Sequence, residues 1–471
     1  MIASVWLAIT LGGFFVCIKV GEGERSIRMK TVIKILAYML ATMALCVALL
    51  TFSACIPRAS IQRQSQSSAE YFANRKPFGV LYQDYINTIQ DNYSDTLLCN
   101  IAYCIDPSQP FASVIRAKYA QGEYTEVYED YLAVVNGREE PNKEYGRYWH
   151  GSLVLIRPLL VVMPIGMIRI LFGLIIIILQ GSILTILMRK GKTAFAVCWM
   201  LGLLLVHPWM LFTSLEYETA FLTASIASLV ILLKKDHSDA GTMPFFMVTG
   251  VITCFVDFLT TETLTFTLPM LLLLADDNAK EKDVGKTSQT SWSVKTVCLS
   301  VLKNGLCWLC GYLAMFFLKL GLLVKIAGMD VFKSSMDEGL LRLGGNVRTA
   351  NSSIAPIVDM GTQISGAVWH NLACLYPTHA GKMQAAAAWI PTLVILAIGF
   401  AAVYLLHDRI DGRIFLPMGI VAILPYLRFI ALSNHSYEHF FITYRAQMVT
   451  IVAFFFFVFD NGIRQIIAIR K

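Results

Sequence analysis

The chain has 471 residues, of which 56% are hydrophobic and 15% are charged, and its mean hydropathy is +0.60. Soluble domains carry about 25% charged residues, so the composition excludes an ordinary soluble protein and indicates a polytopic membrane protein. The formal net charge of +7 comes mostly from Lys and Arg between apolar blocks. Such residues set membrane topology, so we expect a lipid bilayer, and no nucleic acid, as a partner.

Apolar blocks in chain order predict an all-α fold, a polytopic transmembrane helix bundle of about 11 spans. The blocks are 2–19, 32–54, 166–188, 193–212, 216–233, 244–261, 263–275, 305–325, 385–406, 413–433 and 446–461. Residues 25–55 also resemble a secretory or lipoprotein signal. Phe52, however, is bulky at a position that prefers small aliphatic residues, so we interpret this segment as an uncleaved membrane helix.

Basic residues mark every second connection between these blocks, as the positive-inside rule requires of cytoplasmic loops. They include Arg28, Lys30, Arg189, Lys190, Lys234, Lys282, Arg409, Arg413 and Arg464. The alternation predicts an N-terminus outside and a C-terminus in the cytoplasm. It also places two long polar segments, 55–150 and 326–384, on the outer side.

Five regions follow from this division. They are N-terminal membrane helices (1–54), an extracytoplasmic helical loop with an interfacial helix (55–165), central transmembrane helices (166–325), a second extracytoplasmic loop (326–384) and C-terminal transmembrane helices (385–471). The first loop has apolar residues at helical spacing, which predicts a layer of helices on the membrane. Its last part, 149–166, is interrupted by Arg157, Pro158 and Pro164, which favours an interfacial helix over a span.

Ionisable side chains gather near the predicted outer ends of the apolar blocks, where burial makes each one costly and a candidate for function. Asp257 lies toward the outer end of the sixth block, Glu216 begins the fifth and Arg428 lies near the end of the tenth. A structural explanation exists for each. Asp257 and Arg428 could form an ion pair between helices, and Glu216 suits the dipole at a helix start.

The external turn 434–445 contains His435 and His439 with Glu438 between them. This H-x-x-E-H pattern is typical of inverted zincin peptidases. The third zinc ligand of that site is usually a Glu further along the chain, and no Glu follows His439. We therefore interpret the turn as a basic, aromatic-rimmed surface that, with Arg445, suits a phosphate group, and we expect no protein-bound metal there.

Carboxylates for base chemistry, arginines for phosphate and aromatic residues for sugar faces fit transfer of a sugar from a polyprenyl carrier. The stretches "DNYSDTLLCNIAY" (91–103), "RYWHGSLVLIRPLL" (147–160), "VDFLTTETLTFTLPM" (256–270) and "NHSYEHFFITYR" (434–445) are similar to those of a group of bacterial multi-pass proteins. Through that group the chain resembles the C-type (GT-C) membrane glycosyltransferases.

The resemblance implies an integral plasma-membrane enzyme that moves a sugar from a polyprenyl-phosphate-linked donor to a cell-surface glycan or polymer. In these enzymes an external carboxylate activates the acceptor hydroxyl. The candidate catalytic residues are Asp95, Asp84 and Asp257, and the candidate substrate-binding residues are Arg147, His150, Arg157, Glu216, Arg428, His435, His439 and Arg445. The chain departs from the family in having no acidic residue in 55–69. A divalent metal cofactor is compatible with the sequence but not required by it.

Two other functions stay open at this point. A transporter or flippase for lipid-linked glycans would place ionisable residues near the bilayer midplane and show repeat symmetry between its halves. A non-catalytic assembly protein would use the polar cluster only to hold helices together. Cys99 and Cys104 lie in the first external segment and could form a disulfide there.

Overall fold

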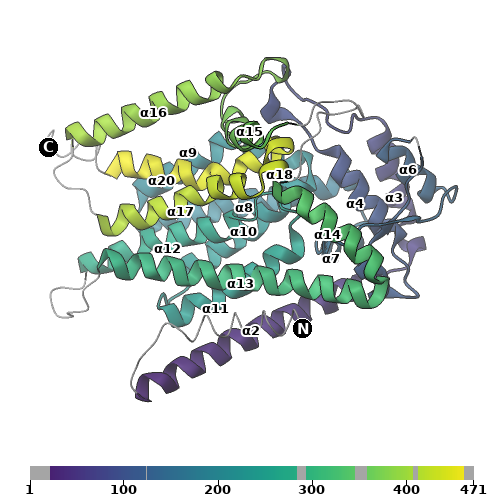
Figure 1. Cartoon of the computed structure of the whole chain (residues 1–471), viewed down its shortest axis with the longest axis horizontal. Helices are drawn as coiled ribbons and strands as arrows, with labels where there is room; N and C mark the ends of the chain where they lie inside the picture. Colours follow the sequence, from purple (N-terminus) through teal and green to yellow (C-terminus); the bar gives the residue numbers. More distant parts are fainter. Residues whose placement is uncertain (1–21, 124, 284–292, 345–357, 407–411, 461–471) are drawn as a thin grey trace.

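The structure is a computed structural model that describes residues 22–123, 125–283, 293–344, 358–406 and 412–460. Most of the described chain is helical, and long helices run side by side with a layer of shorter helices at one end (Figure 1). The sheet within these residues is a two-stranded antiparallel ribbon, in which β1 (Lys118–Tyr119) pairs with β2 (Lys143–Glu144).

The bundle is built from the apolar blocks. Its helices are α2 (Glu22–Ala54), α8 (Ile165–Arg189), α9 (Thr193–Leu205), α10 (Leu215–Leu233), α11 (Asp239–Val256), α12 (Leu264–Asp283), α13 (Val294–Ala327), α16 (Ala385–Leu406), α17 (Gly412–Ala431) and α20 (Met448–Val458). In the described residues, 8 helical segments are long and apolar enough to cross a membrane, and α9 and the apolar part of α12 are shorter. The predicted all-α membrane bundle is confirmed at this level. The block 2–19 lies outside the described residues, so the count of about 11 spans stays a prediction.

Shorter elements form the layer and the connections at the same end of the bundle. They are α3 (Arg58–Ala73), η1 (Ile86–Thr88), α4 (Asn92–Cys104), α5 (Pro110–Arg116), α6 (Val127–Val135), α7 (Leu153–Leu159), η2 (Pro208–Thr213), α14 (Met329–Gly344), α15 (Met360–Ala373), η3 (Ala380–Lys382), α18 (Ser433–Glu438), α19 (Phe440–Thr443) and η4 (Tyr444–Gln447). Local caps define several starts. Asp91 accepts from the Ser94 backbone at α4, and Glu126 and Glu129 form a capping box at α6. Cys99 and Cys104 are separate buried thiols in α4.

Two glycines let α11 and α13 pack with their backbones in contact. A Cβ on Gly250 would lie 2.0 Å from the carbonyl oxygen of Trp308, and a Cβ on Gly311 would lie 2.2 Å from that of Met247. Only glycine fits at either position, because no larger residue leaves room for the opposing backbone. Close helix approach at small residues is how membrane helices gain packing energy when lipid is as apolar as their side chains. The contact fixes the position of α11 along α13, and with it the position of Asp257, which follows the last residue of α11.

Buried cations fasten the layer to the bundle by binding the C-terminal ends of helices. Arg157 is fully buried and donates to the carbonyl oxygens of Ala54 (3.3 Å) and Ile56 (2.8 Å), just where α2 ends. Lys319 of α13 donates to the carbonyl of Ile115 at 2.8 Å, at the end of α5. Positive groups suit these positions because the last carbonyls of a helix lack partners and carry partial negative charge.

Candidate functional site

Asp95 is the centre of a buried joint between the layer and the bundle. Arg169 of α8 donates to it through Nε at 2.6 Å, and the backbone N–H of Leu215 donates at 2.9 Å. Ser214 Oγ donates at 3.2 Å, and Arg169 also donates to Asn92 at 3.0 Å. The carboxylate thus caps the N-terminus of α10, which favours an anion. This candidate base already has three donors around it, which is typical of a structural carboxylate.

Arg428 is the centre of a second joint, and its ion-pair partner is Glu262, not Asp257. Nε of Arg428 donates to Glu262 at 2.7 Å, Nη1 donates to Ser436 at 2.8 Å, and Nη2 donates to the backbone carbonyl of Leu259. The guanidinium therefore holds the turn between α11 and α12 against α18. Leu259 has a φ of 65°, a left-handed conformation that a branched residue adopts only when its surroundings enforce it.

Asp257 lies in the turn that Arg428 holds. It is 3% exposed, and its carboxylate accepts from the backbone N–H of Thr260 at 3.1 Å and from the Thr260 hydroxyl. Burial raises the pKa of Asp257 to about 7 and the charge of Glu262 adds to the rise, while the Thr260 donors and Arg428 oppose it. A carboxyl that titrates near neutral pH can accept a proton from a substrate and release it again.

Glu216 faces other carboxylates. The residue is 7% exposed, and among the described contacts its side chain has no hydrogen bond or ion pair. Asp91, Asp95 and Asp257 all lie near enough to act on it electrostatically. Asp91 is 1% exposed, and burial raises its pKa to about 6. The start of α10, the cap of α4 and the end of α11 thus bring acidic groups together from three parts of the chain.

Glu218, one position beyond Tyr217, is in a different environment. Both of its carboxylate oxygens are sealed from solvent and lack hydrogen-bond partners among the described residues. The charges that act on it are those of Asp95 and Arg169. Glu218 therefore lies beside the Asp95 joint, and Asp95 is also among the carboxylates that act on Glu216.

The basic residues of the turn 434–445 differ in how far they are exposed to solvent. His435 is 6% exposed and lies 3.4 Å from Arg428, His439 is half-buried, and their ring centroids are 4.7 Å apart. Arg445 is 1% exposed, donates to the carbonyl of Phe441 at 2.8 Å, and has its Cζ 4.0 Å from the ring centroid of Tyr217. Its Nε and Nη2 have no hydrogen-bond partner in the described chain. Cation–π contacts with the rings of Tyr217 and Tyr444 therefore help to stabilise its charge.

The remaining predicted site residues have other hydrogen-bond partners, although the His150 ring lies 5.0 Å from that of Phe258, which follows Asp257. Arg157 caps α2, as described above. Arg147 donates to the Tyr145 hydroxyl at 2.8 Å, and His150 is buried with a φ of 53° and bonded to the Tyr145 carbonyl. Burial lowers the pKa of His150 to about 3, so it is neutral at pH 7. Asp84 is exposed in a turn whose backbone carbonyl accepts from Ala380, at the outer surface of the layer.

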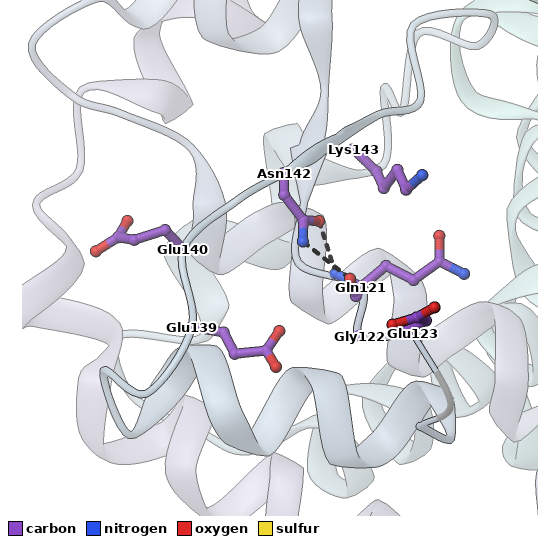
Figure 2. Close-up of a pocket in the computed structure, with 7 residues that line it drawn as sticks. All are labelled: Gln121, Gly122, Glu123, Glu139, Glu140, Asn142 and Lys143. Atoms are coloured by element: carbon purple, nitrogen blue, oxygen red, sulfur yellow. Dashed lines mark hydrogen bonds between the residues drawn. The ribbon is translucent and has the colours of Figure 1, made fainter.

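A surface pocket of about 600 Å³ lies elsewhere in the layer. Figure 2 shows Asn142 hydrogen-bonded to the backbone of Gln121 across it. Its lining consists of Gln121, Gly122, Glu123, Glu139, Glu140, Asn142 and Lys143. Most of these residues are exposed, and no residue that the sequence predicted for the site is among them.

Arg169, Asp91 and Glu262 are site residues that the sequence-based list did not include. Arg169 carried a signal, because it interrupts an apolar block that can span a membrane. Asp91 and Glu262 lie next to predicted candidates, but their burial depends on distant parts of the chain. In the described residues no group of three or more His, Cys, Asp or Glu side chains is arranged to hold a metal ion.

Comparison with protein-family models, curated proteins and solved structures found no significant match to the chain. We therefore infer the function from the arrangement of the residues. That arrangement places a carboxyl with a pKa near 7, an unpaired buried glutamate and a buried guanidinium without a carboxylate partner where the layer meets the bundle.

Proposed function

We propose that this protein is an integral membrane glycosyltransferase that moves a sugar from a polyprenyl-phosphate carrier to a cell-surface glycan acceptor. One observation carries the proposal. Tyr217, whose ring centroid lies 4.0 Å from Cζ of the buried Arg445, is the neighbour in α10 of Glu216, on which buried carboxylates act. A lipid-linked sugar needs opposite charges in this order, with a cation for its phosphate and carboxylates for its hydroxyl groups.

In this proposal Asp257 acts as the general base. The acceptor hydroxyl oxygen forms a bond to the anomeric carbon while Asp257 takes the hydroxyl proton. The bond between the anomeric carbon and the phosphate oxygen breaks, and polyprenyl phosphate leaves with the electron pair. Glu216 binds sugar hydroxyl groups, and Arg445, with His435 and His439, supplies positive charge for the phosphate.

Arg428 positions this machinery, because it fixes the turn that carries Asp257. Asp95, whose oxygens are engaged by Arg169 and the start of α10, has a supporting role in the proposal. The segment that connects the layer back to the membrane helices is stabilised by Arg147, His150 and Arg157. Asp84 lies far out on the layer surface, where it could contact only the distal part of a polymeric acceptor.

Membrane placement follows the same proposal. We infer that α9 and α12 cross the bilayer together with the eight longer segments, so that the basic connections at Lys190, Lys234 and Arg413 all face the cytoplasm. The layer then lies outside a bacterial plasma membrane, where polyprenyl-linked sugars and surface glycans meet. With the block 2–19 as a further span, the total would be the predicted eleven.

A reconstitution experiment tests the proposed activity. Purified protein in liposomes is given polyprenyl-phosphate-linked sugars and cell-envelope glycan, and release of polyprenyl phosphate is measured. We expect release that requires both the donor and the acceptor. Movement of an intact lipid-linked sugar across the bilayer, without release, would instead identify a transporter. Neither release nor movement with any donor tested would favour a non-catalytic assembly role.

A further inference from the structure

Arg445 is a buried cation with donors that the protein does not use. Its Nη1 donates to the carbonyl of Phe441 at 2.8 Å, whereas Nε and Nη2 are sealed from solvent and have no hydrogen-bond partner in the described chain. No described Asp or Glu lies within ion-pair distance of it. Buried donors of a charged group are costly without acceptors, so an anionic ligand would stabilise this position.

Two tyrosine rings form walls beside this guanidinium. Its Cζ lies 4.0 Å from the ring centroid of Tyr217 and 4.7 Å from that of Tyr444. The hydroxyl of Tyr217 donates to the carbonyl of Ile89 at 2.6 Å, and the hydroxyl of Tyr444 donates to that of Val206 at 3.2 Å. Both hydroxyl protons are therefore used within the protein, and the donors left for a ligand are those of the guanidinium.

The segment 78–89 of the first loop, which we call the strap, contacts these walls from the layer. Ile89 at its end is the acceptor for Tyr217. Phe78 at its start packs against Phe441, with ring centroids 5.8 Å apart, and is itself 47% exposed. The strap thus connects the surroundings of the buried guanidinium to the surface of the layer.

Hydrogen bonds join the middle of the strap to the second wall. Asn87 donates to Nε2 of His207 at 3.3 Å, and Nδ1 of the same ring lies 3.0 Å from the hydroxyl of Tyr444. The Asn87 amide also donates to two carbonyls of the second loop, those of Cys374 at 3.1 Å and Tyr376 at 3.3 Å. Removal of this one amide would therefore loosen the strap from the wall and from the second loop.

The strap is held in a backbone conformation that its own residues disfavour. Gln83 and Asp84 have φ angles of 44° and 58°, in the left-handed region that residues with a Cβ adopt at a cost. Contacts with the second loop maintain this turn. The Ala380 N–H donates to the Asp84 carbonyl at 2.9 Å, and Tyr85 pairs with His379 in an antiparallel bridge. Release of these contacts would relieve the strain, which offsets part of the cost of moving the strap.

We propose that the strap closes a phosphate-binding site built on Arg445, and that the ligand enters when the strap moves away from Tyr217 and the second loop. In the closed form the Ile89 carbonyl occupies the Tyr217 hydroxyl. In the open form that hydroxyl is released, and Nε and Nη2 of Arg445 face the ligand, a pair of donors that matches two phosphate oxygens. The inference rests on the proposed function only for the identity of the phosphate, that of a polyprenyl carrier.

A reversible lock on the strap tests the inference without any turnover. Tyr85→Cys combined with His379→Cys places two thiols at paired positions of the antiparallel bridge, where a disulfide can form. The full-length protein in lipid nanodiscs is titrated with inorganic phosphate or, separately, with polyprenyl phosphate in the bilayer, and the saturable rise in unfolding temperature gives the affinity. We expect oxidation to weaken binding about tenfold or more, because the binding-competent form is depleted, and reduction to restore it. The wild type, treated in the same way, controls for the native thiols. Equal affinities of the oxidised and reduced variant would overturn the strap.

Asn87→Ala and Asn100→Ala form a matched pair that needs no disulfide. Both residues are buried asparagines of the layer that donate to backbone carbonyls, Asn100 to that of Ala120 at 2.9 Å. Asn87→Ala should speed hydrogen exchange of the Ile86 amide, which donates to Thr378, and tighten phosphate binding by about three- to tenfold, because opening costs less. Asn100→Ala should change neither. Equal responses of the two variants would contradict the strap.

Arg445→Gln tests the site itself. The substitution leaves no carboxylate of the described chain without its partner, so the variant should fold, and its binding of both phosphates should fall about a hundredfold. Affinity equal to that of the wild type would overturn the site.

The results separate the inference from the function on which it rests. Binding that depends on Arg445 and on the lock, with inorganic phosphate but not with polyprenyl phosphate, would support the site and reject the lipid carrier. Binding of polyprenyl phosphate with the same dependence would support both. Release of polyprenyl phosphate from a sugar donor at the same rate by the oxidised and reduced variant would leave the transferase proposal standing and reject the strap.

Discussion

The two ends of the bundle use charged residues in different ways. At the end away from the layer, Asp276 pairs with Lys190 at 3.1 Å and with Lys192 at 3.0 Å. Both lysines also donate to backbone carbonyls, Lys190 to Leu232 at 2.9 Å and Lys192 to Ala275. Each of these three charges has an opposite charge or a helix terminus to stabilise it, and this group gives no reason to expect a ligand.

At the layer end the charges do not balance. Asp95 and Glu262 have arginine partners, whereas Asp91, Glu216 and Asp257 have none in the described chain. Arg445 is buried against tyrosines without a carboxylate at ion-pair distance. A charged residue in a membrane bundle is therefore a weak indication of function when it has a partner of opposite charge. A charged residue that the fold leaves without such a partner is a stronger one.

The largest expected effect comes from breaking the Asp95 joint. Asp95→Asn leaves Arg169 charged and buried without its partner, which should lower the free energy of unfolding by about 3–5 kcal/mol. Thermal unfolding of the purified variant checks this. Asp95→Asn combined with Arg169→Gln should recover part of the loss, since no unpaired charge is left. A single variant as stable as the wild type would show that the pair is not a structural joint.

Arg428→Lys should have the next largest effect. Lysine retains the charge but cannot reach Glu262, Ser436 and the Leu259 carbonyl together. We expect a loss of about 2–3 kcal/mol, typical of hydrogen bonds to a charged group, and a loss of sugar transfer because the Asp257 turn is released. Unfolding and polyprenyl phosphate release are measured on the same preparation. Full activity in a destabilised variant would show that the reaction does not depend on the conformation of the Asp257 turn.

Asp257→Asn should change how stability depends on pH. The pKa of Asp257 is raised to about 7 in the folded state, so the folded protein holds this proton between about pH 4 and pH 7 while the unfolded chain releases it. Its contribution is fully present below the unfolded pKa and is lost as pH rises through 7. We therefore expect Asp257→Asn to lose this part of the decline in stability between pH 5 and pH 8, by about 2–3 kcal/mol.

Unfolding curves at pH 5 and pH 8 for the wild type and the variant measure this difference. Asp91, with a pKa raised to about 6, contributes in the same direction and stays in both proteins. Parallel pH dependence in the two proteins would show that Asp257 is not a buried proton acceptor.

The smallest effect is expected at the opposite end. Asp276→Asn removes ion pairs to Lys190 and to the largely buried Lys192, but both lysines keep their backbone carbonyl acceptors, so its cost should be about 1–2 kcal/mol. Sugar transfer should be unchanged. A large loss of transfer, without unfolding, would contradict the contrast between the two ends.

Hydropathy predicted most helix positions because burial in lipid is a local property of a segment. Blocks 32–54 and 385–406 coincide with the apolar parts of α2 and α16. Block 193–212 divides at Val206 instead, because His207 has a left-handed φ of 56° and Pro208 starts a new helix. Block 305–325 begins earlier, at Val294, where Ser293 caps the helix. Capping residues and turns determine where a helix begins and ends, and a hydropathy profile does not detect them.

The site was predictable only in part. Asp257, Glu216 and Arg428 were identified because they are charged residues at the ends of apolar blocks. Their partners could not be deduced, since Arg169 and Asp95 are 74 residues apart and Arg428 and Glu262 are 166 apart. No local pattern encodes such pairing. The pair of Asp257 with Arg428 that the sequence suggested is an example. In the structure Arg428 pairs instead with Glu262, five residues beyond Asp257 in the chain.

The rate of polyprenyl phosphate release by Asp257→Asn and by Asp276→Asn tests the central claim most directly. Each variant loses one buried or half-buried aspartate charge, one at the layer end and one at the opposite end. If the uncompensated end is the site, Asp257→Asn should lower kcat by about a hundredfold or more, with Asp276→Asn within about twofold of the wild type. Equal rates for the two variants would contradict the account.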